Sequence, residues 1–135
     1  MYQTVVDGVI KKLNEQFPKI QTVIAPCKYE LETPYFEVGI SEAIEKPVNG
    51  PRYLRIMNVF VNYHLNTGQS SLSYYQVLSD LMNHLELLSL DDGTLLKGSS
   101  RMGTLEKECF KFLVVYQKYF IKDQKKEDLM EEIKF

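Results

Sequence analysis

The first part of the chain carries apolar side chains at helical spacing. These positions, three and four residues apart, are Val6, Val9, Ile10, Leu13 and Phe17. The spacing predicts an amphipathic helix over residues 4–17, because one face of a helix recurs about every 3.6 residues. Pro18 ends it, since proline disfavours helical geometry in the residue before it.

A second helix is predicted after the Asn-Thr-Gly sequence at residues 66–68, with Ser70 or Ser71 as its cap. Its apolar stripe comprises Tyr74, Val77 or Leu78, Leu81, Leu85 and Leu88. The Asp-Asp-Gly sequence at residues 91–93 is typical of a tight turn and separates this helix from the strand segment predicted over residues 94–97.

The other apolar segments have the composition of strands. They cover residues 20–25, the segment that begins at Pro34, and residues 52–65, 94–97 and 108–121. Residues 42–51 contain Pro47 and the sequence Asn-Gly-Pro, which is typical of a turn. We therefore expect the strands on either side of residues 42–51 to form a long β-hairpin arm.

Together these elements predict an α+β domain over residues 1–121. Its sheet is expected to be mostly antiparallel or mixed, with four to five strands and two main helices packed on one face. Residues 122–135 form a charged C-terminal tail, in which Leu129, Met130 and Ile133 give a short helix one apolar face.

The two longest predicted strands are apolar on both faces. In residues 52–65, Met57, Val59 and Val61 alternate with Ile56 and Phe60. Two helices cover about one face of such a sheet, so the second face is an apolar patch larger than a monomer usually exposes. We expect another protein chain to cover it. The alternative is cover by loops and the C-terminal tail of the same subunit.

Composition limits the possible functions. The 135 residues are 44% hydrophobic and 25% charged, with a net charge of −2. This balance is globular and lacks the excess positive charge that binding to nucleic acid requires. The longest apolar run, residues 112–116, is too short to span a membrane, and residues 1–12 lack an apolar signal core. We therefore expect no membrane association and no sequence-specific nucleic-acid binding.

The sequence contains no recognisable catalytic motif. Asp80 and His84 share a helix face at metal-ligand spacing, but the sequence offers no third ligand nearby. The sequence between Gly93 and Gly98 lacks the Gly-Lys-Ser/Thr that a phosphate loop needs. We expect neither a cofactor nor a metal, and no enzymatic activity. A pocket that gathers His64 or His84 with two carboxylates would favour a hydrolase or metal enzyme instead.

The hairpin tip is the candidate interaction site. A long hairpin that projects past its sheet is marginally stable alone and is often ordered against a neighbour. The candidate interface residues are Glu42, Glu45, Lys46, Arg52, Tyr53 and Arg55 at the tip, together with Leu129, Met130 and Ile133 in the tail. The alternative is a solvated loop.

Several runs resemble one known family. These are Pro34–Ile40 (PYFEVGI), Gly50–Arg55 (GPRYLR) and Val59–Tyr63 (VFVNY). The spacing from these runs to the second helix, and on to Asp92–Leu95 and Gly98, is also similar, as is a first helix that ends in Phe17-Pro18. Over nearly the whole chain they resemble the tail-terminator, or tail-completion, proteins of phages and prophages of Gram-positive bacteria.

The resemblance implies a structural role without catalysis or cofactor. Such proteins form a homo-oligomeric ring, commonly sixfold, on the head-proximal end of the tail tube. The ring stops polymerisation of the tail tube protein and presents a joining surface to the head-tail connector protein. The implied location is the virion tail, after assembly in the host cytoplasm. The alternative is a small oligomeric α+β protein-binding module that is not of phage origin.

Overall fold

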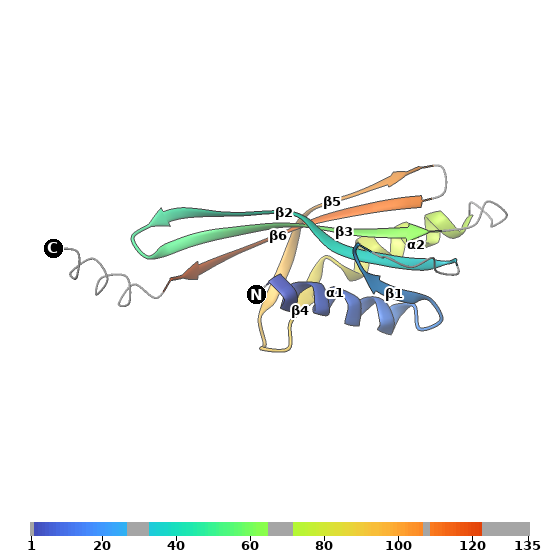
Figure 1. The fold of residues 1–135 in the computed structure, drawn as a ribbon, viewed down its shortest axis with the longest axis horizontal. Helices are drawn as coiled ribbons and strands as arrows, with labels where there is room; N and C mark the ends of the chain where they lie inside the picture. Colours follow the sequence, from blue (N-terminus) through green and yellow to red (C-terminus); the bar gives the residue numbers. More distant parts are fainter. Residues whose placement is uncertain (1, 27–32, 65–71, 107–108, 123–135) are drawn as a thin grey trace.

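The computed structural model describes residues 2–26, 33–64, 72–106 and 109–122. The helices and strands found there, drawn in Figure 1, are α1 (Tyr2–Gln16), β1 (Gln21–Ile24), β2 (Tyr35–Asn49), β3 (Arg52–His64), α2 (Leu72–His84), β4 (Leu87–Ser89), β5 (Leu95–Leu105) and β6 (Cys109–Ile121). The two predicted helices and the strand predicted over residues 52–65 are confirmed to within two residues at most ends. The second helix is the exception, because it stops at His84 and Leu88 belongs to β4.

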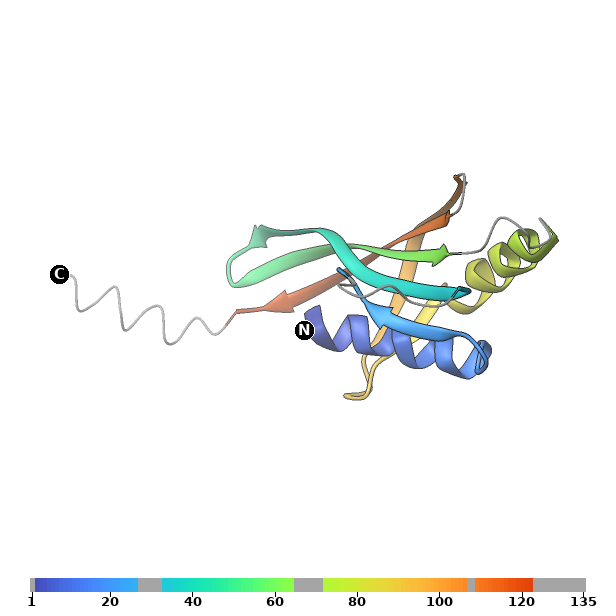
Figure 2. The same cartoon turned by 45° about the vertical axis from the view of Figure 1, so that its right-hand side comes forward.

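All six strands join one sheet in the order β1-β2-β3-β6-β5-β4. β1 runs parallel to β2, and every other neighbouring pair is antiparallel. α1 contacts β1 and β2 at one end of this order and β4 at the other. The sheet therefore curls until both of its edge strands reach the same helix, as Figures 1 and 2 show from two directions.

The expected four- to five-stranded sheet with two helices packed on one face is wrong. The sheet has six strands, because residues 87–89 form β4 and β5 continues through Leu105. The curl also prevents the helices from forming a simple layer. α1 lies inside the curve, whereas α2 packs beside β6 near one end of the sheet (Figure 2). Twist between neighbouring strands accumulates across a sheet and produces such curvature.

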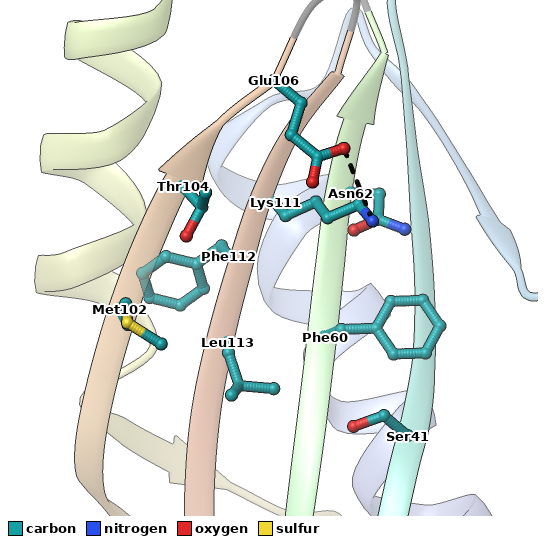
Figure 3. Close-up of a pocket in the computed structure, with 9 residues that line it drawn as sticks. All are labelled: Ser41, Phe60, Asn62, Met102, Thr104, Glu106, Lys111, Phe112 and Leu113. Carbon is teal, nitrogen blue, oxygen red and sulfur yellow. Dashed lines mark ion pairs between the residues drawn. The ribbon is translucent and has the colours of Figure 1, made fainter.

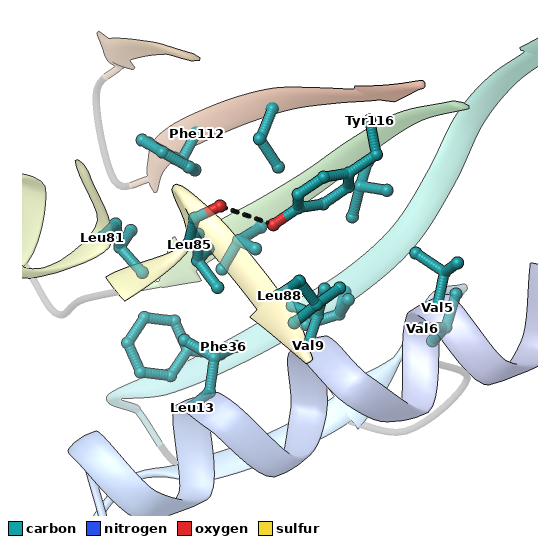
Figure 4. Close-up of a cluster of buried hydrophobic side chains, with 14 of the residues drawn as sticks. Val5, Val6, Val9, Leu13, Phe36, Leu81, Leu85, Leu88, Phe112 and Tyr116 are labelled. Carbon is teal, nitrogen blue, oxygen red and sulfur yellow. Dashed lines mark hydrogen bonds between the residues drawn. The ribbon is translucent and has the colours of Figure 1, made fainter. Parts of the chain in front are cut away.

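The core fills the inside of this curve. Buried valines and Leu13 of α1 point toward Leu88 of β4 and Phe36 of β2, as Figure 4 shows. β3 contributes its odd-numbered residues from Met57 to Tyr63, and β6 its even-numbered residues from Phe110 to Tyr116. The alternating residues of β3 and β6 point to the opposite side, which we call the outer face of the sheet.

Tyr116 provides the one buried side-chain hydrogen bond among the described residues that ties β6 to the end of α2. Its hydroxyl donates to the backbone carbonyl of Leu85 at 2.7 Å, and burial raises the pKa of this phenol (Figure 4). We expect Tyr116→Phe to lower the free energy of unfolding by about 1–3 kcal/mol, because the Leu85 carbonyl loses its donor. Urea denaturation measures this. Tyr119→Phe is the matched control, since Tyr119 is 59% exposed, and an equal loss in both variants would contradict the prediction.

The predicted hairpin arm is present, and a third strand joins it. The core ends at Met57 of β3 and Tyr116 of β6, but β2, β3 and β6 continue together beyond it (Figure 1). We call residues 42–49, 52–56 and 117–121 the arm. Its turn contains only Gly50 and Pro51, and Gly50 has a φ of 55°, which glycine adopts without steric cost. Residues 42–49, expected as a turn, are strand.

Candidate assembly surfaces

The carboxylate of Glu45 links the arm to α1. Its Oε2 accepts a hydrogen bond from the Tyr2 hydroxyl at 2.7 Å. The same oxygen accepts from Arg55 Nε at 2.9 Å and lies 2.8 Å from Arg55 Nη2. Glu45 and Arg55 are cross-strand neighbours in the β2–β3 register, whereas Tyr2 begins α1. The carboxylate therefore connects the arm to the first turn of α1.

Aromatic rings enclose the cations of this cluster. The Arg55 guanidinium carbon lies 4.2 Å from the ring centre of Phe120 and 4.8 Å from that of Tyr2. Lys122 Nζ lies 4.4 Å from the ring centre of Tyr53 and 3.7 Å from Glu45 Oε1. A cation over the face of an aromatic ring is attracted to its quadrupole. The inner side of the arm is thus occupied by contacts within one subunit.

The Glu45 cluster makes folding stability depend on pH in the acid range. The Tyr2 hydrogen bond, followed by the contacts with Arg55 and Lys122, lowers the pKa of the Glu45 carboxyl. A carboxyl with a lowered pKa contributes stability above its unfolded-state pKa, and this contribution is lost as the pH falls through the folded-state value. We expect Glu45→Gln to remove that part of the acid-induced fall in melting temperature below about pH 4.5.

Tyr2→Phe is the companion variant for this measurement. It keeps the carboxylate and its arginine but removes the hydrogen bond that contributes most to the lowered pKa. The acid-induced fall from this group should therefore be smaller than in the wild type and should end at higher pH, because the folded-state pKa of Glu45 lies closer to its unfolded value. Melting temperatures that follow one curve in all three proteins between pH 2 and pH 6 would contradict this role of Glu45.

The predicted interface residues of the arm divide into two groups. Glu45, Tyr53 and Arg55 belong to the intramolecular cluster, and the Arg55 side chain is only 14% exposed. Glu42, Lys46 and Arg52 are exposed. Arg52 projects over the ring of Tyr119 at 6.0 Å on the outer face. Contact of either group with another subunit stays a prediction. The predicted tail residues Leu129, Met130 and Ile133, and the short helix expected there, lie outside the described residues.

The outer face carries an apolar stripe. From the arm toward the far end of the sheet it comprises Ile121, Tyr119, Leu54, Ile44, Ile56, Val115, Phe60, Leu113 and Met102. Exposure reaches 73% at Ile121, 59% at Tyr119 and 56% at Met102. No helix of the described chain covers this stripe. Figure 3 views its far end, at Phe60, Leu113 and Met102, with α1 behind the strands. The apolar second face predicted from the sequence is thus present, although what covers it is not shown.

A shallow hollow interrupts the stripe at the end of the sheet away from the arm. It has a volume of about 440 Å³ and lies between Phe60, Met102 and Leu113, as Figure 3 shows. An ion pair between Lys111 Nζ and Glu106 Oε2, 3.5 Å apart, lies at its rim. The lining is apolar with a polar border, a composition that suits contact with a protein side chain.

Titratable groups do not assemble into a recognisable reaction centre in the described chain. His64 Nε2 lies 3.3 Å from a single carboxylate, Glu37 Oε1. Cys109 is the cross-strand neighbour of His64, but burial raises the pKa of its thiol, the opposite of what an activated nucleophile needs. Among the described residues, no group of three His, Cys, Asp or Glu side chains could hold a metal ion. None of the described helices is long and apolar enough to cross a membrane.

Sequence reasoning identified part of this arrangement. It named Glu45 and Arg55, whose pairing follows once the hairpin register is known. It missed Tyr2, Phe120 and Lys122, because only the fold brings these distant positions together. It placed Ile56, Phe60 and Leu113 on the second face correctly but missed Met102, since the second half of β5 was not predicted.

An apolar sheet face that no described helix covers and a projecting arm suit a protein that assembles with other proteins. The comparison with protein families makes this specific: the phage tail terminator proteins match residues 4–128. The chain belongs to this family, which confirms the resemblance found in the sequence. The alternative of a binding module unrelated to phage is therefore set aside.

The other comparisons add little. No curated protein matches the chain. One solved structure without a descriptive name is similar at a TM-score of 0.47 and 14% identity, over 89% of this chain and 92% of its own. Similarity at this level supports no argument about function.

Membership of the family establishes the general role of the protein. The protein is a phage structural component that acts in virion assembly and is located in the tail. It works together with other tail or head components, and the family is structural and not enzymatic. The Gram-positive origin stays a prediction.

Proposed function

We propose that this protein caps the head-proximal end of the tail tube. Bound there, it stops further addition of tube subunits and presents the surface to which the head-tail connector protein joins. The observation that carries the proposal is the family match, which extends over residues 4–128.

The capping unit is proposed to be a closed homo-oligomeric ring, sixfold as in the family that the sequence resembles. Head-to-tail contacts close into a ring only when each subunit has two different adhesive surfaces. The arm and the outer face supply candidates, since exposed apolar side chains such as Tyr119 and Ile121 lie on the arm whereas Met102 lies at the far end of the sheet. The ring is proposed to assemble in the host cytoplasm, on a tube that has reached its length.

Tube polymerisation in vitro tests the capping step. Purified tail tube protein is allowed to polymerise with and without this protein, and tube lengths and tube ends are recorded by negative-stain electron microscopy. We expect shorter tubes that carry an additional disc of density at one end. A tenfold excess of bovine serum albumin serves as the control for crowding. Tubes of unchanged length with bare ends would overturn the proposal.

A second readout tests the joining surface. Capped tubes are mixed with purified connector protein and separated by sedimentation. Connector that cosediments with capped tubes, and not with bare tubes, supports the joining role. Equal cosedimentation with both kinds of tube would contradict this role but leave the capping step standing.

A further inference from the structure

Both long edges of the arm are unpaired in the described chain. β1 pairs with β2 only as far as Val38, so residues 40–49 of β2 have no strand partner on the side away from β3. β5 pairs with β6 only from Phe110 to Tyr116, so residues 117–121 of β6 likewise have none. An unpaired strand edge presents backbone N–H and C=O groups that another strand can bind.

The edge of β2 is protected against such pairing. It contains Pro47, which lacks an N–H donor, and the charged side chains of Glu42 and Lys46 are exposed on it. Its register with β3 also shifts twice, between Ile40 and Glu42 and between Pro47 and Asn49. Proline, charge and bulges are the features by which proteins prevent edge-to-edge association.

The edge of β6 has none of these features over residues 117–121. Its register with β3 is unbroken and it contains no proline. Its one charged residue, Lys118, is engaged on the inner side, where Nζ donates to Thr94 Oγ1 at 3.2 Å. The exposed side chains here include Tyr119 and Ile121. Of the two edges of the arm, only this one is suited to strand pairing.

A second unprotected edge lies at the other end of the sheet. β4 pairs with β5 only through Lys97, so residues 100–105 of β5 have no strand partner on the side away from β6. This segment also lacks proline, and its one register shift with β6 comes before Ser100. Its charged residue, Arg101, is engaged within the subunit by the Gly98 carbonyl and Glu86. Met102 and Leu105 are 56% and 55% exposed. The β5 edge and the β6 edge of one subunit do not meet, because residues 100–105 pair with β6 on one side and have their free edge on the other.

We propose that residues 117–121 of β6 in one copy pair with residues 100–105 of β5 in the next copy. The inference rests on the proposed ring and names the contact that closes it. Each subunit supplies one edge of each kind, so the contact is head-to-tail and leaves both edges satisfied once the ring closes. The two segments are of similar length. Pairing places the exposed Tyr119 and Met102 side chains beside a neighbouring subunit.

Hydrogen exchange tests the pairing directly. Backbone amide exchange is measured by mass spectrometry on the full chain, first dilute and then as the ring, isolated either from concentrated solution or bound to tube ends. We expect about every second amide in both segments to exchange at least about tenfold more slowly in the ring, because alternate groups of an edge strand face the new partner. Residues 42–49 of the β2 edge serve as the internal control and should not show this alternate protection, because no strand of a neighbour pairs with them.

Each other outcome overturns the pairing. Slowing in residues 117–121 without slowing in residues 100–105 means that two β6 edges pair symmetrically, or that the C-terminal tail occupies the β6 edge. A ring in which neither segment slows leaves the proposed function intact and removes this contact. Absence of any ring, in solution and on tubes, overturns both proposals together.

A matched pair of lysine variants gives an independent readout. Tyr119→Lys places a charge on the β6 edge, and Val48→Lys places the same charge on the β2 edge at a side chain of similar exposure, 59% against 49%. We expect Tyr119→Lys to weaken self-association at least about tenfold by sedimentation velocity, whereas Val48→Lys has no effect. Equal effects in two variants with wild-type circular dichroism would contradict the pairing.

Discussion

Phe36→Ala should lower the free energy of unfolding by about 3–5 kcal/mol, which is a large part of the total stability of a domain of this size. Phe36 is completely buried where β2 meets α1. Its ring centre lies 5.0 Å from that of Phe17, just after α1, and 4.9 Å from that of Tyr63 on β3. Truncation leaves a cavity between these two rings, and the lost contacts add to the lost burial of the Phe36 ring.

Urea denaturation followed by circular dichroism measures the Phe36 effect. Tyr75→Ala is the surface control, because Tyr75 is 64% exposed and its truncation should change stability by no more than about 0.5 kcal/mol. Phe36→Leu retains most of the buried volume and should fall between the two. A Phe36→Ala protein that loses less than about 1 kcal/mol would mean that the β2–α1 interface is not a tightly packed core.

Ile44→Asp should prevent ring assembly while the subunit stays folded. Ile44 lies on the apolar stripe beside Ile56 and is 37% exposed in the single subunit. In the free subunit water still reaches the new carboxylate. In an assembly that covers the stripe, the carboxylate loses that water without gaining a cation, at a cost of several kcal/mol. Each 1.4 kcal/mol is about a tenfold change in affinity, so self-association should weaken by about a hundredfold or more.

Sedimentation velocity and electron microscopy of tube ends measure the Ile44 effect. Tyr75→Asp is the matched control, since it introduces the same charge on α2, away from the outer face. We expect wild-type assembly from this control and overlong, uncapped tubes with Ile44→Asp. Normal capping by Ile44→Asp would show that the stripe is not an assembly surface, whatever else the arm does.

The sequence predicted elements well where one pattern dominated. The spacing of Val6, Val9 and Leu13 leaves little choice but a helix, and the aromatic and β-branched run in β3 leaves little choice but a strand. The stripe of α2 was extended too far, because Leu85 and Leu88 keep helical spacing while Leu88 and Leu90 also alternate as a strand does. Short apolar runs fit either periodicity, and only tertiary contacts decide between them.

The arm shows why turn chemistry can mislead. Pro47 and the Asn-Gly-Pro sequence favoured a loop over residues 42–51, yet Pro47 lies in an edge strand, where a missing N–H costs nothing. The second half of β5 was missed for a related reason: its Gly, Ser and Thr residues give no apolar alternation. Gly103 nevertheless allows a close approach there, because a Cβ would lie 2.6 Å from Leu78 and Phe110 side-chain atoms, which would have to shift.

The position of α1 inside the curled sheet has a consequence for how the protein folds during its synthesis. α1 leaves the ribosome before any of the described strands, but its buried contacts include Leu88, and Lys11 Nζ forms an ion pair with Asp91 at 3.5 Å. β6, the strand between β3 and β5, is translated last of all the strands. Contacts between such distant positions form slowly. The nascent chain therefore holds α1 without a completed partner until β6 has emerged, so closure of the sheet waits for the last described strand to be synthesised.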